Sequence, residues 1–386
     1  MRTFILLLFT FSFLSVSSQK TIYKNYESEE LKDIRDITIY LPKSYEKDSI
    51  SNFPLAIVLD GHKLLDLYIG ASNYYASQDN APEQIIVGID MKETRTKDAS
   101  YDITNSKLTT DGKRFYLFIR DELIPYIEAN YKTSPFLTIA GESLTANFIT
   151  HFLKEQDPIF NAYICLNPTL APDTNNQVSG YNLEKMQPLD NTFYFYVSGN
   201  PFAKSEKLNR TNAFGKFMKT VGVSNFHVVF DELSSSPSSS SVIGEGMSRA
   251  FAKIFEIYSG ITKSEYEEKI KDLSPPDAIA YIETKYLDIE FLFGSNIGIR
   301  KSDVIAIEDI IIEKENGDYL KDFGEMILKL YPTSEMGHYY MGRYYESGKD
   351  FKAALEEYRI GYGKMNPADP NADLFYRNVE RILGKF

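Results

Sequence analysis

The pattern of apolar and polar positions divides the chain into two parts. From Ile37 to Gly260, short apolar runs alternate with longer segments whose apolar positions recur every three or four residues. The runs at 53–61 (FPLAIVLDG) and 83–90 (EQIIVGID) are almost continuously apolar, which is typical of strands buried on both faces. Alternation of such strands with helices predicts an α/β fold with a mostly parallel sheet.

One long amphipathic segment, residues 113–131 (KRFYLFIRDELIPYIEANY), is expected to be helical. Its regularly spaced apolar positions are Phe115, Phe118, Ile119, Leu123 and Ile127. Pro125 lies within this segment, and proline cannot donate the backbone hydrogen bond of a helix interior. We therefore expect the helix to kink or restart there.

After Ile261 the remaining chain has helical patterning, with one β-branched run at 303–314 (DVIAIEDIIIEK). Near the end, several positions have the spacing of a tetratricopeptide repeat, in which small residues let antiparallel helices touch closely. These positions are Met341, Gly342, Tyr345, Asp350, Phe351, Ala354, Tyr358, Gly361 and Pro367. An ordinary helical hairpin explains the spacing equally well, because such repeats normally need three copies. We expect residues 261–386 to form a small, tetratricopeptide-like helical domain packed on the first.

The chain opens with Met1 and Arg2, an apolar run from Phe4 to Leu14, and small residues up to Ser18. This order is typical of a secretory signal peptide, and the run is short for a membrane span. We expect residues 1–18 to be removed on export to the periplasm or medium, leaving no transmembrane segment and an α/β domain at 19–260. The alternative is an uncleaved membrane anchor.

The net charge and the counts of cysteine and histidine disfavour several classes of partner and site. The formal net charge is −12, which disfavours nucleic acid as a partner because phosphate backbones are repelled. The single cysteine, Cys165, lies in an apolar run and is expected to be a buried, inert thiol. No two of the four histidines have metal-ligand spacing, so neither a metal nor a cofactor is expected.

Residues 136–153 (FLTIAGESLTANFITHFL) have the pattern of a strand, a sharp turn with Ser143 at its tip, and a helix. A serine there projects from the carboxyl edge of the sheet, near backbone N–H groups that can stabilise an oxyanion. The usual motif is G-x-S-x-G, whose small flanks fit the strained turn. Gly141 meets that need, and Thr145 meets it poorly.

Four stretches in order resemble the putative-esterase branch of the α/β-hydrolases, which includes the enterochelin esterases and S-formylglutathione hydrolases. They are 36–61, 85–100, 119–146 and 160–170, and the likeness extends over about residues 30–258. The resemblance implies an α/β-hydrolase sheet flanked by helices, a serine–acid–histidine triad in that chain order, and an oxyanion hole. On this mapping Ser143 is the nucleophile, and the donors are the Leu144 N–H and the loop at Gly61 and His62.

The other two members of the implied triad are missing. Asn200 occupies the acid slot, and an amide carries no charge to steady an imidazolium. Ser239 occupies the histidine slot, inside the serine-rich run at 234–241 (SSSPSSSS), which we expect to be flexible. His62, at the same edge of the sheet as Ser143, is either a surrogate base or a residue supporting the oxyanion loop. Glu142 is either a weak base or a solvated charge.

Three hypotheses of function follow. The first is an exported, degenerate esterase, a pseudoenzyme that binds a ligand or protein without hydrolysing it, because a serine without base and acid has no route to the alkoxide. The second is an active serine esterase that hydrolyses a small carboxylic ester with Ser143 and a surrogate base, His62 or Glu142. The third assigns the work to the C-terminal helices, which would dock a protein partner. A small ester or siderophore-like molecule is the expected ligand of the first two.

Overall fold

The computed structural model describes residues 20–47, 51–181, 183–189, 191–294, 297–365, 369 and 372–386. The expected signal peptide, residues 1–18, lies outside these ranges. Within them, no helix combines the length and apolar character needed to cross a bilayer. No group of three or more His, Cys, Asp or Glu side chains in the same ranges could hold a metal ion.

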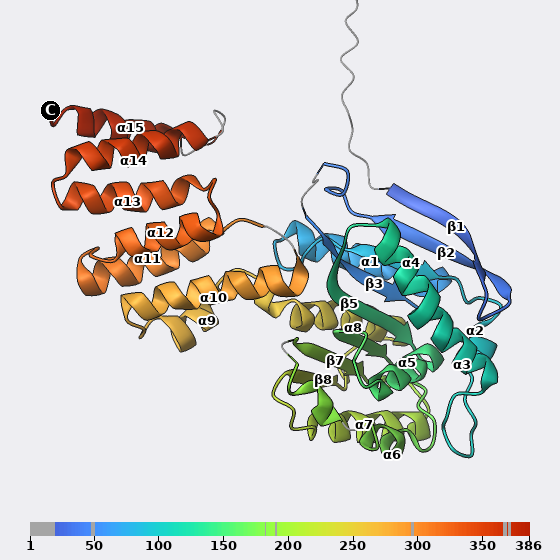
Figure 1. Ribbon diagram of the computed structural model, residues 1–386. Coiled ribbons are helices and arrows are strands. Elements are labelled where there is room, and N and C mark those ends of the chain that lie inside the picture. The colour runs from blue at the N-terminus through green and yellow to red at the C-terminus, as the bar shows by residue number, and fades with distance from the viewer. Residues whose placement is uncertain are drawn as a thin grey trace, which may run out of the picture.

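An eight-stranded sheet forms the centre of the first part of the chain, in the order β1-β2-β4-β3-β5-β6-β7-β8 (Figure 1). The strands are β1 (Lys20–Ser28), β2 (Asp33–Leu41), β3 (Phe53–Val58), β4 (Ile85–Ile89), β5 (Thr133–Glu142), β6 (Ala162–Leu166), β7 (Phe193–Ser198) and β8 (Phe226–Asp231). β2 pairs antiparallel with both β1 and β4, and every other pairing is parallel. The predicted α/β fold with a mostly parallel sheet is confirmed.

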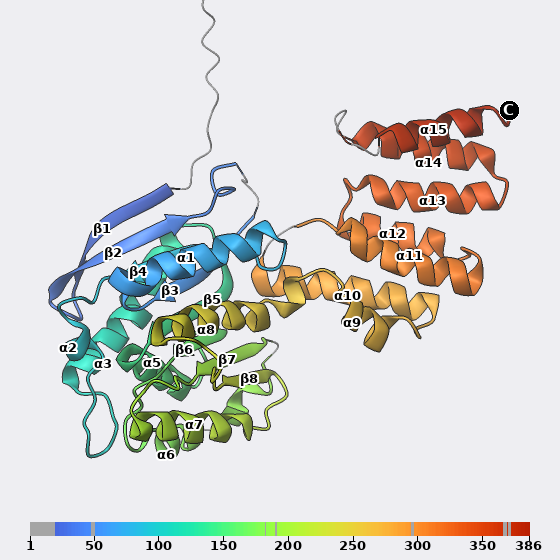
Figure 2. The same ribbon diagram turned by 180° about the vertical axis from the view of Figure 1, so that it is seen from behind.

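Helices cover both faces of the sheet, and we call residues 20–258 the sheet unit. The longer helices are α1 (Gly61–Ser77), α3 (Thr110–Leu117), α4 (Ile124–Asn130), α7 (Ser205–Lys219) and α8 (Ser239–Ile254). The short ones are α2 (Arg95–Asp98), α5 (Leu144–Ile149), η2 (Thr150–Lys154), α6 (Thr174–Ser179), η3 (Leu183–Met186) and η4 (Glu256–Tyr258). Figure 2 shows α1 and α8 together on one face, and their buried side chains share one cluster.

The predicted interruption at Pro125 is present. A π-helical turn, η1 (Phe118–Leu123), separates α3 from α4, and Pro125 lies in the first turn of α4. Because proline has no backbone N–H to donate to a preceding turn, the hydrogen-bond pattern changes where α4 begins. The amphipathic segment therefore continues in one direction while its hydrogen-bond pattern restarts.

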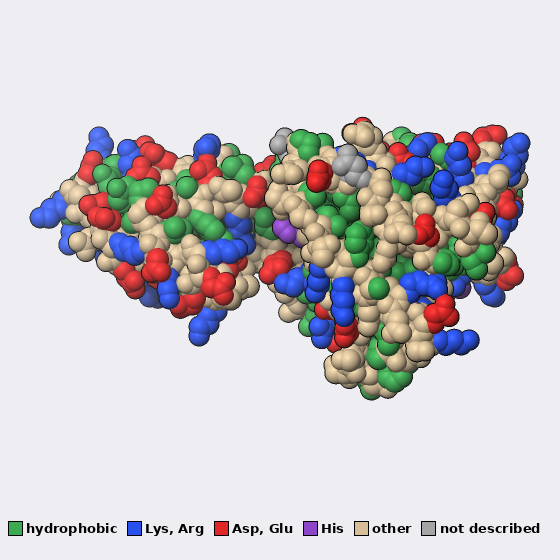
Figure 3. Space-filling model, turned by 90° about the horizontal axis from the view of Figure 1, so that it is seen from below, with side chains coloured by type: hydrophobic (Ala, Val, Ile, Leu, Met, Phe, Trp, Pro, Cys, Tyr) green, Lys and Arg blue, Asp and Glu red, His purple; other side chains and the backbone are tan. Residues whose placement is uncertain are grey.

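The rest of the chain is helical, and we call residues 263–386 the helical arm. Its helices are α9 (Lys263–Glu265), η5 (Tyr266–Ile270), α10 (Pro275–Phe293), α11 (Lys301–Glu315), α12 (Leu320–Leu330), α13 (Glu335–Ser347), α14 (Phe351–Lys364) and α15 (Ala372–Leu383). Figure 3 shows the helical arm extending from one side of the sheet unit, with acidic and basic side chains interspersed. The β-branched run at 303–314 is part of α11.

Small residues lie where successive arm helices touch. A Cβ added to Gly324 would lie 2.6 Å from the backbone oxygen of Gly337, and one on Gly342 would lie 2.6 Å from the Tyr358 ring. Close helix contacts of this kind are what the repeat-like spacing predicts. Assignment of the helical arm as a tetratricopeptide domain stays a prediction.

The helical arm is attached to the sheet unit through the end of α10. Phe293 lies 4.8 Å from Phe136 of β5 and 5.6 Å from Phe255, measured between ring centroids. All three rings are buried in the cluster that also contains the inward side chains of α1 and α8. The expected domain boundary at Gly260 falls between η4 and α9, so α10 crosses back to the sheet unit after that point. The division into two domains remains a prediction.

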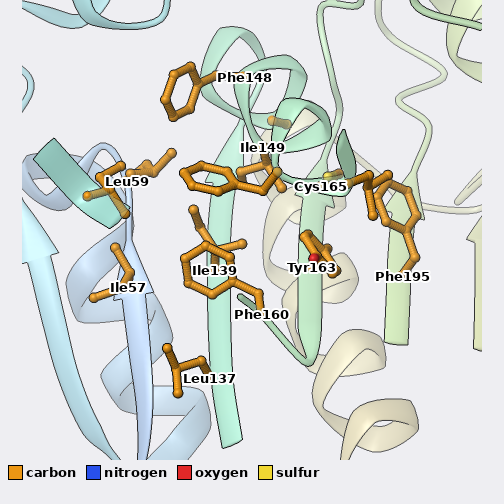
Figure 4. Close-up of a cluster of buried hydrophobic side chains, with 14 of the residues drawn as sticks. Ile57, Leu59, Leu137, Ile139, Phe148, Ile149, Phe160, Tyr163, Cys165 and Phe195 are labelled. Atoms are coloured by element: carbon orange, nitrogen blue, oxygen red, sulfur yellow. The ribbon is translucent and has the colours of Figure 1, made fainter. Parts of the chain in front are cut away.

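Alternate residues of the central strands point to opposite faces of the sheet. Leu55, Ile57 and Leu59 pack into one buried cluster, and Ala56 and Val58 pack into the other. Figure 4 shows part of the first cluster, where side chains of β3, β5 and β6 lie near Phe148 of α5 and near Phe160. Burial on both faces explains why these strands are continuously apolar. The parallel pairing of β3 with β5 places their carboxyl ends side by side.

Candidate active site

Ser143 lies between the end of β5 and the start of α5. Its backbone conformation (φ 61°, ψ −107°) is one that residues other than glycine rarely adopt. Its N–H donates to the backbone oxygen of Leu166 at 2.9 Å, and its own backbone oxygen accepts from the Thr169 N–H at 2.8 Å. Such a conformation costs about 1–3 kcal/mol and persists only where the surroundings impose it. The sharp turn expected at Ser143 is therefore present and held by the adjacent strand and loop.

Thr145, in the position where the motif has its second glycine, is part of a hydrogen-bonded turn. Its hydroxyl is fully buried, accepts the Glu142 N–H at 3.0 Å and lies 2.7 Å from Oδ2 of Asp60, to which it donates. The same oxygen is where a Cβ on Gly141 would collide, at 2.8 Å. Threonine is tolerated because Gly141 leaves room for it, and its hydroxyl ties the turn to the loop after β3.

We expect Gly141→Ala to lower the free energy of unfolding by about 1–3 kcal/mol, because the added methyl overlaps Thr145 and the Ile149 side chain. The measurement is urea unfolding of both proteins. Gly70→Ala is the matched control, because nothing lies within 4 Å of its added Cβ in α1. Equal midpoints for the two variants would contradict tight packing around Gly141.

Asp60 and Arg95 clamp the turn from the other side. Asp60 is fully buried, and its carboxylate accepts from Nε of Arg95 at 2.6 Å and from Nη2 at 3.1 Å. Nη2 also donates to the backbone oxygen of Glu142 at 2.7 Å. A planar guanidinium suits this role because its donors have fixed directions. The clamp holds the residue before Ser143 against α2 and the loop after β3.

Two side chains lie within hydrogen-bonding distance of the Ser143 hydroxyl. Thr169 Oγ1 is 2.7 Å from Ser143 Oγ, and Lys207 Nζ, from the first turn of α7, is 3.4 Å away. No imidazole or carboxylate of the described residues is hydrogen-bonded to this oxygen. Among the described residues, Lys207 is therefore the one titratable side chain within hydrogen-bonding distance of the Ser143 hydroxyl.

Burial is the main cause that lowers the pKa of Lys207 from its ordinary value, because desolvation disfavours the ammonium form. The positive charges of Arg95 and Lys63 lower this pKa further, and the carboxylate of Glu142 opposes them. Glu142 itself pairs with Lys63. The site thus gathers three cations around two carboxylates, and Lys207 has no carboxylate partner among the described residues.

The family model described as "Putative esterase" matches residues 28–200 of this chain. This region includes β2 to β7, the Asp60–Arg95 clamp and the turn at Ser143. Over these residues, which we call the putative-esterase region, the chain is similar to the putative-esterase family. The match confirms the resemblance drawn from the sequence, and the fold is that of an esterase-like hydrolase.

Solved structures of other proteins have the same fold as this chain, and the matches extend beyond the putative-esterase region. An uncharacterised protein from Capnocytophaga ochracea is 22% identical with a TM-score of 0.81, and the match covers 95% of this chain and 100% of that one. An IroE-like serine hydrolase from Shewanella oneidensis is 19% identical with a TM-score of 0.58, covering 81% of this chain and 98% of that one. The BES protein from Bacillus cereus is 19% identical with a TM-score of 0.51, covering 67% and 99%. No curated protein sequence matches.

Asn200 and Ser239 stand at the positions where the resemblance implies an acid and a histidine, and each takes part in local backbone structure. Asn200 is buried at the end of the putative-esterase region, and its side-chain oxygen accepts the Phe202 N–H at 2.9 Å, which closes its own turn. Ser239 is the exposed first residue of α8, with Ser238 as the cap. The serine-rich run is therefore not irregular throughout, because Ser238 accepts the Ser241 N–H and starts a helix.

The histidines lie in other surroundings. His62, in the first turn of α1, has its Nδ1 3.5 Å from Oδ1 of Asp90, and His151 is buried. The His227 ring packs against Tyr194, and His338 pairs with Glu357 at 2.7 Å. Assignment of His62 as a surrogate base stays a prediction, with Asp90 as its described partner.

The oxyanion donors expected from the sequence occupy helix starts at one sheet edge. Leu144 begins α5, and Gly61 and His62 begin α1, where the first backbone N–H groups have no partner within the helix. These helices follow β5 and β3, which are parallel neighbours. Their use in catalysis stays a prediction.

Proposed function

We propose that the chain hydrolyses small carboxylic esters, with Ser143 as the nucleophile and Lys207 as its general base. The contact between Lys207 Nζ and the Ser143 hydroxyl carries the proposal. A neutral lysine amine can accept a serine proton, and a lysine next to a nucleophilic serine is a known variant of the triad. The strained turn at Ser143 supports a working nucleophile, because strain of this kind gathers at functional sites.

In each half of the proposed reaction, Lys207 accepts one proton and then gives it to the leaving group. Neutral Lys207 takes the proton of Ser143 as Oγ attacks the ester carbonyl, and the oxyanion forms near the N–H groups of Leu144 and of Gly61–His62. The resulting ammonium gives the proton to the leaving alcohol. Water then attacks the acyl-enzyme, Lys207 accepts its proton, and the return of that proton to Oγ releases the carboxylic acid.

The direct test compares turnover of p-nitrophenyl acetate and butyrate by the native protein and by Ser143→Ala. We expect turnover to fall to the level of buffer in Ser143→Ala. Ser347→Ala, on an exposed serine of α13, is the matched control and should hydrolyse both esters like the native protein. Equal turnover by native protein and Ser143→Ala would contradict the proposal.

A second candidate is binding without turnover. It is favoured by Asn200 and Ser239 in the slots for acid and histidine. With Lys207 protonated, its ammonium would donate to Ser143 Oγ and attract an anionic group of the ligand. A siderophore-like ester is the candidate ligand from the sequence resemblance. Retained binding of such an ester, with no product released at any pH, would establish this candidate over the first.

We also propose that the protein acts after export, in the periplasm or medium, because of the pattern at residues 1–18. The expected mature start is Gln19, and N-terminal sequencing of protein recovered from the producing cells would show it. A start at Met1 would contradict export by cleavage. Docking of a protein partner on the helical arm remains a proposal supported by the helix pattern alone.

A further inference from the structure

A cavity lies away from Ser143, between α3, η1, η2 and α6. Its volume is about 740 Å³, within the range of pockets that hold small molecules. It shares no lining residue with the surroundings of the Ser143 hydroxyl described above. The loop at 99–109, which extends toward α6 in Figure 1, closes one side, with the Ser106 hydroxyl accepting the Asp173 N–H at 2.8 Å.

Positive charge dominates the lining of this cavity. It contains Lys107, Lys113, Arg120 and Lys154, and a single carboxylate, Glu155. Arg120 and Glu155 pair with each other at 3.4 Å. The ammonium groups of the three lysines have no side-chain hydrogen bond or ion pair with the described residues. Such a gathering of unpaired cations is unexpected in a chain with a net charge of −12.

The floor of the cavity is aromatic and neutral at pH 7. His151 is buried, which is the main reason why its pKa falls to about 4, and the nearby Lys154 lowers it further. Burial raises the pKa of Tyr181 to about 12. The Tyr181 hydroxyl lies 3.5 Å from Nδ1 of His151, and the Tyr116 ring stacks on Phe152 at 4.3 Å between centroids. The floor therefore consists of aromatic side chains and neutral polar atoms beneath a cationic rim.

We propose that this cavity binds a small organic anion, a carboxylic acid with an aromatic body. The ring would lie against Tyr116, Tyr181 and His151, and the carboxylate would reach the ammonium groups of Lys113 and Lys154. Both parts are needed, because exposed lysines alone are solvated and an apolar floor alone does not select charge. The site is independent of the proposed ester hydrolysis.

The test is isothermal titration of the native protein with 1-naphthoate and with its neutral analogue, 1-naphthamide. We expect 1-naphthoate to bind at least tenfold more tightly than the amide. Lys154→Glu and Lys113→Glu should each weaken 1-naphthoate about tenfold, because each reverses one rim charge. Lys352→Glu, an exposed position on α14, makes the same charge change and should bind like the native protein.

Two results would overturn the proposal. One is equal affinity for 1-naphthoate and 1-naphthamide, and the other is equal weakening by Lys352→Glu and Lys154→Glu. Ser143→Ala should bind 1-naphthoate with unchanged affinity. That result separates this cavity from the ester site, so that failure of either proposal can be recognised without the other.

Discussion

Lys207→Met is expected to lower kcat/KM for p-nitrophenyl butyrate by about 10³-fold, within the range that general-base catalysis contributes. Methionine keeps the length and apolar stem of the half-buried side chain but cannot accept a proton from Ser143. The remaining activity should come from the turn and the oxyanion donors. Steady-state kinetics at pH 9 measures the effect, because more of the native Lys207 is neutral there.

Lys216→Met, the same change at an exposed position of α7, should leave kcat/KM unchanged. The unfolding midpoint of Lys207→Met should stay close to that of the native protein, because the ammonium has no carboxylate partner to leave behind. A loss of less than threefold in Lys207→Met would remove Lys207 from the mechanism. Any remaining hydrolysis that depends on Ser143 would then require a base other than Lys207.

Arg95→Met is expected to lower the free energy of unfolding by about 2–4 kcal/mol. The change leaves the fully buried carboxylate of Asp60 without its cation, which is the costly way to break a buried pair. The loss of stability should be smaller than for a fully isolated buried charge. Arg95 is partly exposed, so water can enter the space it leaves and solvate the Asp60 carboxylate. Urea unfolding measures the change.

Asp60→Asn in the Arg95→Met background should recover part of that loss, because the amide carries no charge and can still accept from Thr145. Arg114→Met, at an exposed position on α3, is the matched control and should change stability by less than about 0.5 kcal/mol. If the double variant is as unstable as the single one, the buried charge is not the source of the cost. The clamp would then act by packing alone.

The sheet was predictable where a strand is buried on both faces. β3 is apolar at every position and buried at every position, so its sequence shows its environment directly. β1 was not predicted, because it lies at the sheet edge with mostly exposed side chains and is held by backbone pairing with β2. The β-branched run in α11 has the composition of a strand, yet it packs as a helix among the buried side chains of the helical arm.

The candidate site was predictable at Ser143 and not at Lys207. The turn is local in sequence, so the small Gly141 and the strand and helix patterns on either side mark it. Lys207 reaches the serine only because α7 is oriented across the edge of the sheet, and a lysine in the first turn of a surface helix has no distinguishing pattern. Histidine and carboxylate side chains are the usual bases for a serine, yet the amine of a lysine can also act as one when burial lowers its pKa.

The rate at which a fluorophosphonate labels Ser143, followed from pH 6 to pH 11, tests the central claim most directly, because labelling requires an activated serine and no chosen substrate. The lowered pKa of Lys207 means that its neutral form appears below the ordinary value of 10.5. The account predicts a tenfold rise in rate per pH unit, levelling before pH 10.5, and no such rise in Lys207→Met. A rate that is zero at every pH, or that has the same pH dependence in Lys207→Met, would contradict it.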